Sequence, residues 1–261
     1  MEKNEKIKEI IIGSGKIEKL KEIIQGSSNI VFFGGAGVST ESGVPDFRSE
    51  NGLYSAVKDY GYPPEEMLSY SFFMSHTEVF FNYYKTNLIY QKAQPNKAHK
   101  ALAKLEAEGK LKAVVTQNID GLHQSAGSKT VFELHGSVLH NHCMDCGKTY
   151  ELSYIMNPEN CKGSIPKCES CGGIVKPDVI LYEEALDETV IRQATLAIGQ
   201  ADTLIVGGTS LVVYPAAGLI NYYHGKNLIL INKSSTQYDH LANLVINDAI
   251  AEVLGVILLQ Y

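Results

Sequence analysis

The stretch "NIVFFGGAGVSTESGVPDFR", Asn29 to Arg48, decides the fold class of this chain. The run "NIVFF" is apolar enough for a buried strand, and the glycine-rich turn Gly35-Ala36-Gly37 follows it at once. A turn of this kind brings backbone N–H groups close to a phosphate. Thr40 replaces the third glycine of a dinucleotide-binding GxGxxG motif, and residues 45–48 are charged or aromatic. The stretch therefore predicts a nucleotide site with reactive side chains beside it.

Strands and helices alternate outward from this stretch. A helix over residues 16–25 precedes it, with Gly26 as its end. A second unit, "NKAHKALAKLEAEGKLKAVVTQN", has a helical apolar period followed by the strand "KAVVT". Further strands are expected in "TVFELHG", "ADTLIVGGTSL", "KNLILINK" and "ANLVIND", and further helices over residues 189–199 and 215–224. This alternation predicts an α/β fold, a Rossmann-like doubly wound parallel sheet covered by helices on both faces.

Two segments interrupt the alternation. Residues 49–95 are rich in Tyr, Phe and Pro and favour loops plus a helix around residues 76–92, and residues 136–178 hold all five cysteines. We expect one catalytic domain over residues 1–261, in which these two insertions together form a smaller, zinc-binding lobe.

Composition narrows the function classes. The chain has 261 residues, 44% of them hydrophobic and 20% charged, as is usual for a globular protein. Its net charge of −6 argues against direct nucleic-acid binding through phosphate neutralisation. No stretch is long and apolar enough for a membrane span or a secretory signal, so we expect a cytoplasmic protein without membrane contact.

The cysteine spacing indicates a metal site. The pairs Cys143-x-x-Cys146 and Cys168-x-x-Cys171 are separated by 21 residues. Two CxxC turns supply four thiolates to one tetrahedral zinc ion, and such a closed shell leaves no position for substrate. The alternative, four unrelated thiols, fits this pairing poorly. Cys161 is expected to be a spare thiol, while His140 and His142 are either alternative ligands or surface residues.

Polar residues gather where the expected strands end. Gln117, Asn118 and Asp120 follow "KAVVT", His135 follows the next strand, and Ser210 and Asn232 follow two more. Ligands of doubly wound sheets bind at this edge. Turn chemistry alone would explain Asn118 and Asp120, and a lone histidine is more often structural. With Asp46 and Arg48, however, the set predicts chemistry on a bound nucleotide.

The combination of motifs resembles the sirtuins, NAD-dependent protein lysine deacylases, here of the bacterial type. "GAGVSTESGVPDFRS", "TQNIDGLHQSAG", "ELHGS", the paired CxxC, "KPDVILYEE", "GTSLVVYPAA" and "INK" occur in sirtuin order over Val31 to Val253. The resemblance implies NAD as a consumed co-substrate, one structural zinc held by the four cysteines, and a cleft between two lobes. Its implied NAD-contacting residues are Ala36, Gly37, Thr40, Asp46, Phe47, Arg48, Gln117, Asn118, Ile119, Asp120, His135, Gly208, Thr209, Ser210, Asn232, Lys233 and Ala249.

The resemblance also implies a mechanism. The acyl oxygen of the substrate attacks the ribose carbon as nicotinamide leaves, with Asn118 and Asp120 lining the nicotinamide pocket and Phe47 shielding the reacting carbon. His135 then takes a proton from a ribose hydroxyl, which suits an imidazole because it titrates near neutral pH. The products are nicotinamide, O-acyl-ADP-ribose and free lysine.

The implied substrate is an acyl-lysine protein or peptide. It would add as a strand to "VKPDVILYEE", with Val179, Ile180 and Tyr182 as contacts. Sirtuins that prefer succinyl or malonyl groups carry a Tyr-x-x-Arg pair after the DFR motif. Here no arginine occurs between Arg48 and Arg192, which favours acetyl and other uncharged acyl groups.

Three other functions were weighed. A dehydrogenase lacks support because no acidic residue follows a second strand to hold a ribose. A zinc-ribbon binding module leaves the polar edge unexplained. A sirtuin-like protein ADP-ribosyltransferase is the main alternative, and the presence of His135 argues against it. The resemblance favours a monomer.

Overall fold

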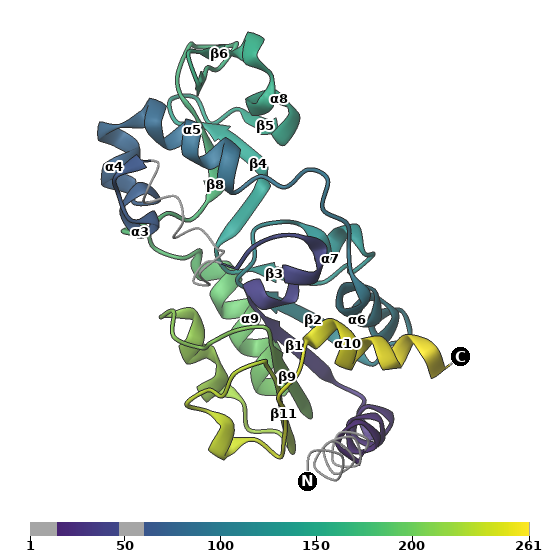
Figure 1. Cartoon of the computed structure of the whole chain (residues 1–261). Coiled ribbons are helices and arrows are strands. Elements are labelled where there is room, and N and C mark those ends of the chain that lie inside the picture. The colour runs from purple at the N-terminus through teal and green to yellow at the C-terminus, as the bar shows by residue number, and fades with distance from the viewer. Residues whose placement is uncertain (1–14, 47–59, 261) are drawn as a thin grey trace, which may run out of the picture.

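A six-stranded parallel sheet forms the body of the molecule in the computed structural model, which describes residues 15–46 and 60–260 (Figure 1). The strand order is β11-β10-β9-β1-β2-β3. The chain thus runs outward from β1 in both directions, which is the doubly wound arrangement, and the predicted fold class is confirmed. The strands are β1 (Ile30–Gly34), β2 (Leu111–Thr116), β3 (Val131–Glu133), β9 (Thr203–Gly207), β10 (Asn227–Ile231) and β11 (Leu244–Ile246).

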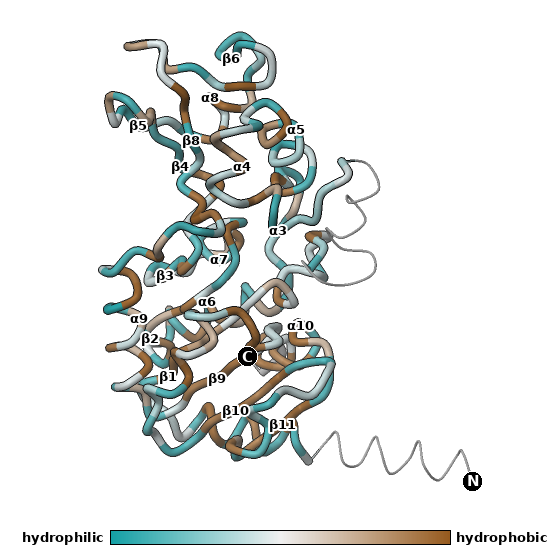
Figure 2. Tube along the Cα trace, turned by 90° about the vertical axis from the view of Figure 1, so that its left-hand side faces the viewer, coloured by the Kyte–Doolittle hydropathy of each residue, from teal (hydrophilic) through white to brown (hydrophobic). Residues whose placement is uncertain are grey.

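Both faces of this sheet are buried. Ile30 and Phe32 of β1 belong to one hydrophobic cluster, whereas Val31 and Phe33 belong to another, because successive side chains of a strand point to opposite faces. The described part of the N-terminal helix (residues 15–26), α6 (Lys97–Ala107) and α10 (Ile250–Gly255) cover the first face. The second face is covered by α9 (Glu188–Gln200) and the 3-10 helix η5 (Ala216–Tyr222). Figure 2 accordingly shows hydrophobic residues along β9 and β10.

Capping residues set where two of the longer helices, α6 and α9, begin. The side chain of Asn96 accepts a hydrogen bond from the Ala98 amide at 2.9 Å and so begins α6. Asp187 accepts from the amides of Thr189 and Val190 at 2.7 and 3.0 Å and begins α9. Each cap satisfies amides that have no partner within the helix, so the sequence itself determines these boundaries.

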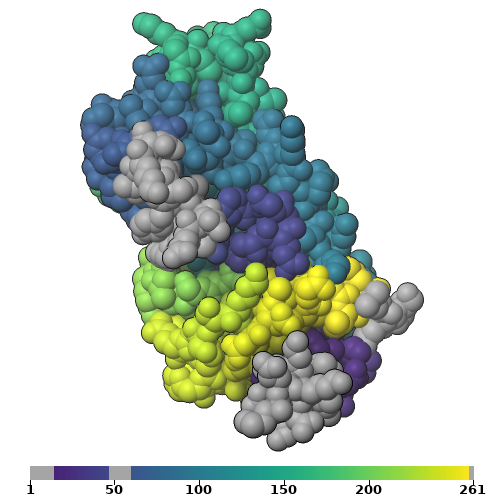
Figure 3. All heavy atoms as spheres, viewed as in Figure 1, coloured from purple at the N-terminus to yellow at the C-terminus, as the bar shows by residue number. Residues whose placement is uncertain are grey.

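A third hydrophobic cluster lies beyond the carboxyl ends of the strands, in what we call the small lobe (Figures 1 and 3). It joins residues 60–89 with residues 119–181, since Phe73, Phe80 and Tyr84 pack in one cluster with Tyr150 and Val175. Its elements are α3 (Pro64–Met67), α4 (Tyr70–Ser75), α5 (Thr77–Asn87), β4 (Gly136–Cys143), β5 (Thr149–Glu151), α8 (Leu152–Met156), η4 (Pro158–Asn160), β6 (Cys161–Lys162), β7 (Ile165–Pro166) and β8 (Val175–Val179).

The small lobe has antiparallel sheets of its own. Strands β5, β4 and β8 form one in that order, and β6 pairs with β7 in the other. Strand β4 begins directly after His135, and Gly136 at its start has φ of +73°. A side chain at Gly136 would lie 1.9 Å from the carbonyl oxygen of Asp178, so β8 approaches here as only glycine allows. This contact places the end of β8 beside His135.

Some expected elements differ from the structure. The helix expected over residues 215–224 is the 3-10 helix η5, and the helix expected around residues 76–92 is the shorter α5, preceded by α4. Among the described residues, no helix is long and apolar enough to span a membrane. The remaining short elements are η1 (Ala36–Val38), η2 (Thr40–Ser42), α7 (Leu122–Ser125), η6 (Asp239–Leu241) and η7 (Val256–Gln260).

Candidate active site

A cavity of about 1000 Å³ lies at the carboxyl ends of the parallel strands, between the sheet and the small lobe. This volume is at the upper end of the range for ligand pockets and suits a ligand as large as a dinucleotide. Most of the residues expected in the site line it: Ala36, Gly37, Thr40, Asp46, Gln117, Asn118, Ile119, Asp120, His135, Val179, Ile180, Tyr182, Gly208, Thr209, Ser210, Asn232 and Lys233.

Three expected residues need separate comment. Ala249 does not line the cavity, although its neighbours Asp248 and Ile250 do. Phe47 and Arg48 lie outside the described residues.

Two glycine-rich loops pack against each other at the cavity floor. The amide of Gly37 donates to the carbonyl of Gly208 at 2.8 Å. A Cβ on Gly37 would lie 2.8 Å from the Cα of Gly208, and one on Gly35 would lie 2.9 Å from the Cβ of Thr209. Both glycines are therefore required for this close approach of the loops after β1 and β9. Because glycine has no side chain, the backbone of these loops itself lines the cavity.

Thr209 connects the loops that follow three strands. Its amide donates to the side-chain oxygen of Asn232 at 2.9 Å, and its hydroxyl accepts from the side-chain nitrogen of Gln117 at 3.1 Å. The side-chain nitrogen of Asn232 is buried and has no partner among the described residues. An unpaired buried donor is costly, and a hydroxyl of a bound ribose would satisfy it. This donor, the glycine cradle and the cavity volume all fit NAD.

Ser39 links the two polar residues expected at the nicotinamide end. Its hydroxyl donates to Asp120 at 2.6 Å and accepts from the side-chain nitrogen of Asn118 at 3.1 Å. The second carboxylate oxygen of Asp120 accepts from the Leu122 amide at 2.9 Å. Asn118 and Asp120 are thus held in fixed orientations. Sequence reasoning missed Ser39, because its partners are about 80 residues away and only the fold brings them together.

His135 lies on the same cavity, between β3 and β4. Its Nδ1 is 3.0 Å from the carbonyl oxygen of Gln117, and its own carbonyl accepts from the Ile180 amide at 2.9 Å. Burial lowers the pKa of His135 below its usual range, while the hydrogen bond to Gln117 acts in the opposite direction. The imidazole is therefore neutral near pH 7, as a general base must be.

The four expected zinc ligands form one cluster. The Sγ atoms of Cys143, Cys146, Cys168 and Cys171 all lie within 4.8 Å of one another. The Sγ atoms of Cys143 and Cys171 are 3.4 Å apart, and those of Cys146 and Cys168 are 3.6 Å apart. Tetrahedral zinc with Zn–S bonds of about 2.3 Å requires sulfur–sulfur distances of roughly 3.8 Å. The geometry fits zinc and is far too long for disulfide bonds.

The other residues considered as zinc ligands lie apart. Within the described residues, the metal-binding cluster contains neither a histidine nor Cys161. His142 instead pairs with Asp178, and His140 is exposed. The thiol of Cys161 is 3.4 Å from the ammonium of Lys85. The four-cysteine shell is closed, which agrees with a structural metal.

The chain is similar to proteins of known family. A family model described as "Sir2 family" matches residues 35–215. A protein named "NAD-dependent protein deacetylase" from Clostridium perfringens is 66% identical over 255 residues, 97% of this chain and 98% of that protein. Its namesake from Clostridium acetobutylicum is 63% identical over 231 residues, 88% of this chain and 93% of the relative.

Solved structures agree with the sequence comparison. One titled "Sir2-p53 peptide-NAD+" superposes with a TM-score of 0.81 at 36% identity, covering 94% of this chain and 98% of that chain. A Sir2 variant with a deacetylated p53 peptide and 3'-O-acetyl ADP ribose has a TM-score of 0.83 at 36% identity, with the same coverage.

Proposed function

The chain belongs to the Sir2 family, whose members are the sirtuins, and we propose that it is an NAD-dependent protein lysine deacetylase. One observation carries the proposal furthest. His135, with its pKa lowered by burial, faces the same cavity as the paired glycine loops and the Ser39-linked Asn118 and Asp120. A base beside a dinucleotide cradle is what acyl transfer to a ribose requires.

Different side chains of the cavity would have different roles in the reaction. Thr209, Ser210, Asn232 and Lys233 would hold the phosphates and the adenosine ribose, since they line the cavity beside the glycine loops. Asn118, Ile119 and Asp120 would surround the nicotinamide. The acyl oxygen would attack the ribose C1′ as nicotinamide leaves, which forms an imidate. His135 would then accept a proton from a ribose hydroxyl that attacks the imidate carbon, and one water would be consumed as the lysine amine leaves. The products would be nicotinamide, O-acyl-ADP-ribose and free lysine.

Residues Val179, Ile180 and Tyr182 would carry the acyl-lysine peptide. They line the cavity at the end of β8, next to His135. Solved relatives whose titles name a p53 peptide or a propionylated peptide support a peptide substrate. The absence of arginine between Arg48 and Arg192 supports acetyl and other uncharged acyl groups over acidic ones.

The zinc would be structural. Four thiolates complete its shell, so it would fix the small lobe and leave catalysis to the cavity residues. We further propose that residues 49–95 and 136–178 are the two insertions that make this lobe, a division supported by their shared hydrophobic cluster. The monomeric state and the cytoplasmic location stay predictions.

The test is mass spectrometry of an acetyl-lysine peptide incubated with the protein, with and without NAD. Loss of the acetyl mass only in the presence of NAD, with one nicotinamide released per peptide, is the expected result. A peptide that gains the mass of ADP-ribose would replace the proposal with the ADP-ribosyltransferase alternative. Deacetylation without NAD would contradict both.

A further inference from the structure

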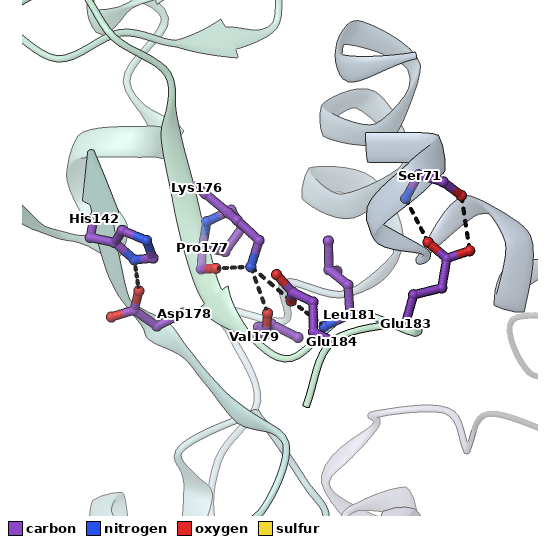
Figure 4. Close-up of polar contacts among 9 residues, drawn as sticks. All are labelled: Ser71, His142, Lys176, Pro177, Asp178, Val179, Leu181, Glu183 and Glu184. Atoms are coloured by element: carbon purple, nitrogen blue, oxygen red, sulfur yellow. Dashed lines mark hydrogen bonds and ion pairs between the residues drawn. The ribbon is translucent and has the colours of Figure 1, made fainter. Parts of the chain in front are cut away.

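The segment from Val179 to Glu184, which we call the substrate strip, is held at several points along its backbone (Figure 4). Its Ile180 amide donates to the carbonyl of His135 at 2.9 Å. Tyr182 exchanges two hydrogen bonds with the start of α4, donating to the carbonyl of Leu68 at 2.9 Å and accepting from the amide of Tyr70 at 3.0 Å. The strip therefore joins the candidate base to the helical part of the small lobe.

A buried lysine supports the strip from one side. Lys176 of β8 is only 6% exposed, and its ammonium donates to the carbonyl oxygens of Pro177 and Val179 and to the carboxylate of Glu184, at 3.3, 3.1 and 3.0 Å. The same carboxylate oxygen of Glu184 accepts from the amide of Leu181 at 2.7 Å. A buried ammonium is stable only with such partners, so the ion pair closes the strip into a compact turn.

A second carboxylate supports the strip from the other side. Glu183 accepts from the amide and the hydroxyl of Ser71 at 2.8 and 2.9 Å. The backbone φ of Glu183 is +76°, a left-handed conformation that is unfavourable for residues other than glycine. Two hydrogen bonds from α4 hold Glu183 in this conformation. Glu183 also lines the cavity. Among the described residues, no backbone–backbone hydrogen bond involves the N–H or C=O of Glu183.

We propose that Lys176, Glu183 and Glu184 are positioning residues that fix the substrate strip in the shape that receives the acyl-lysine peptide. This inference rests on the proposed function. Glu183 is exposed and Glu184 is half-buried, and both carboxylates act by shaping the backbone that the peptide pairs with. Preorganisation of this kind lowers the entropy lost on binding, so its loss weakens peptide binding more than it slows chemistry.

The experiment measures kcat and the KM values of an acetyl-lysine peptide and of NAD for five single variants, one double variant and one control. Lys176→Met and Glu184→Gln remove the ion pair, Lys176→Arg retains it, Glu183→Ala removes the Ser71 contacts, and Glu183→Gly removes them but tolerates the positive φ. Glu66→Gln is the matched control, because Glu66 is an exposed carboxylate on neighbouring α3 that does not line the cavity.

Lys176→Met, Glu184→Gln and Glu183→Ala should each raise the peptide KM by about tenfold while kcat and the KM for NAD stay within about twofold. Glu66→Gln should match the wild type, Lys176→Arg should be affected less than Lys176→Met because it keeps the positive charge, and Glu183→Gly should be affected less than Glu183→Ala. The double variant Lys176→Met/Glu184→Gln should raise the peptide KM by less than the two single effects combined, since both substitutions remove the same ion pair.

Peptide KM values that stay at the wild-type level in folded variants would overturn the positioning role. So would a joint change in kcat and both KM values, which indicates general structural damage. If Lys176→Met does not fold, the comparison of Glu183→Ala with Glu183→Gly decides. Wild-type turnover is measured first: its absence overturns the proposed function itself, whereas normal wild-type turnover with unchanged variants overturns only this inference.

Discussion

The Nδ1 atom of His135 lies 3.0 Å from the carbonyl oxygen of Gln117. A carbonyl oxygen only accepts hydrogen bonds, so Nδ1 must carry a hydrogen in the neutral imidazole. The lone pair is then on Nε2, the other ring nitrogen. One backbone contact therefore selects the tautomer that a general base needs, and it does so from the loop that also carries Asn118 and Asp120.

Replacing His135 tests this assignment. His135→Ala should lower kcat for deacetylation by roughly 10²- to 10⁴-fold, the contribution usual for a positioned base. The fold and the zinc content should be retained, because the half-buried ring makes its hydrogen bond to a loop carbonyl and lies outside the cysteine cluster. His140→Ala is the control, since His140 is an exposed histidine of neighbouring β4. Normal turnover by His135→Ala would remove the histidine from the mechanism.

The pH dependence of kcat/KM is a second test. His135 acts as a base only when neutral, and burial lowers its pKa below the usual value of about 6.5. The pH at which activity has fallen to half should therefore lie below 6.5. A profile that already falls by half above pH 7 would contradict the geometry, because it would place the pKa of the essential base above its usual value.

Two buried histidines predict acid sensitivity. The rings of His99 and His123 are 4.7 Å apart, and of their nitrogens only Nδ1 of His99 has a partner among the described residues. Burial lowers the pKa of His99 to about 4 and that of His123 to about 3. In the unfolded chain both titrate near 6.5, so the unfolded state binds more protons below that pH. The contribution of the two neutral histidines to the free energy of unfolding is therefore fully present above pH 6.5 and is lost as the pH falls below it.

The expected loss between pH 6.5 and pH 5 is roughly 2 kcal/mol for each histidine, from about 1.4 kcal/mol per proton and pH unit. Urea unfolding at several pH values measures it. His123→Leu should flatten the dependence, whereas His240→Ala, at an exposed position, should leave it unchanged. Equal free energies of unfolding at pH 7 and pH 5 would contradict the buried neutral pair.

Zinc removal tests the role of the small lobe. Cys143 and Cys168 are buried in its hydrophobic cluster, so the metal site and the core stabilise each other. Purified protein should contain one zinc per chain, and chelation should lower the unfolding temperature by on the order of 10 °C. Cys168→Ser should lose zinc, while Cys161→Ser should keep it and provides the control. A metal-free protein of unchanged stability would exclude a structural zinc.

The alternation of apolar runs and helical periods predicted the large sheet well. "NIVFF" and "KAVVT" became β1 and β2, because strands buried on both faces are continuously apolar. "TVFELHG" became β3, a short, half-buried strand at the edge of the sheet. The helix expected over residues 215–224 is present over Ala216–Tyr222, but as the tighter 3-10 type. Apolar periodicity does not distinguish these two helices over so few residues.

The site was predictable only where short motifs carried it. The four cysteines and the loop residues at strand ends have local signatures in the sequence. In the structure the cysteines form one cluster, and most of the loop residues line one cavity. Ser39, Lys176 and Glu184 lie within such motifs, but a serine in a loop and a lysine beside a proline do not by themselves indicate their partners. Ser39 meets Asp120 across 81 positions, and Glu183 meets Ser71 across 112, so the fold had to be known first.

A peptide whose lysine carries a ¹³C-labelled acetyl group tests the central claim most directly. The account predicts that the label leaves the peptide only with NAD and appears in O-acetyl-ADP-ribose, in an amount equal to the nicotinamide released. Label that appears from the start as free acetate, with no acetylated ADP-ribose, would mean simple hydrolysis and would contradict the account.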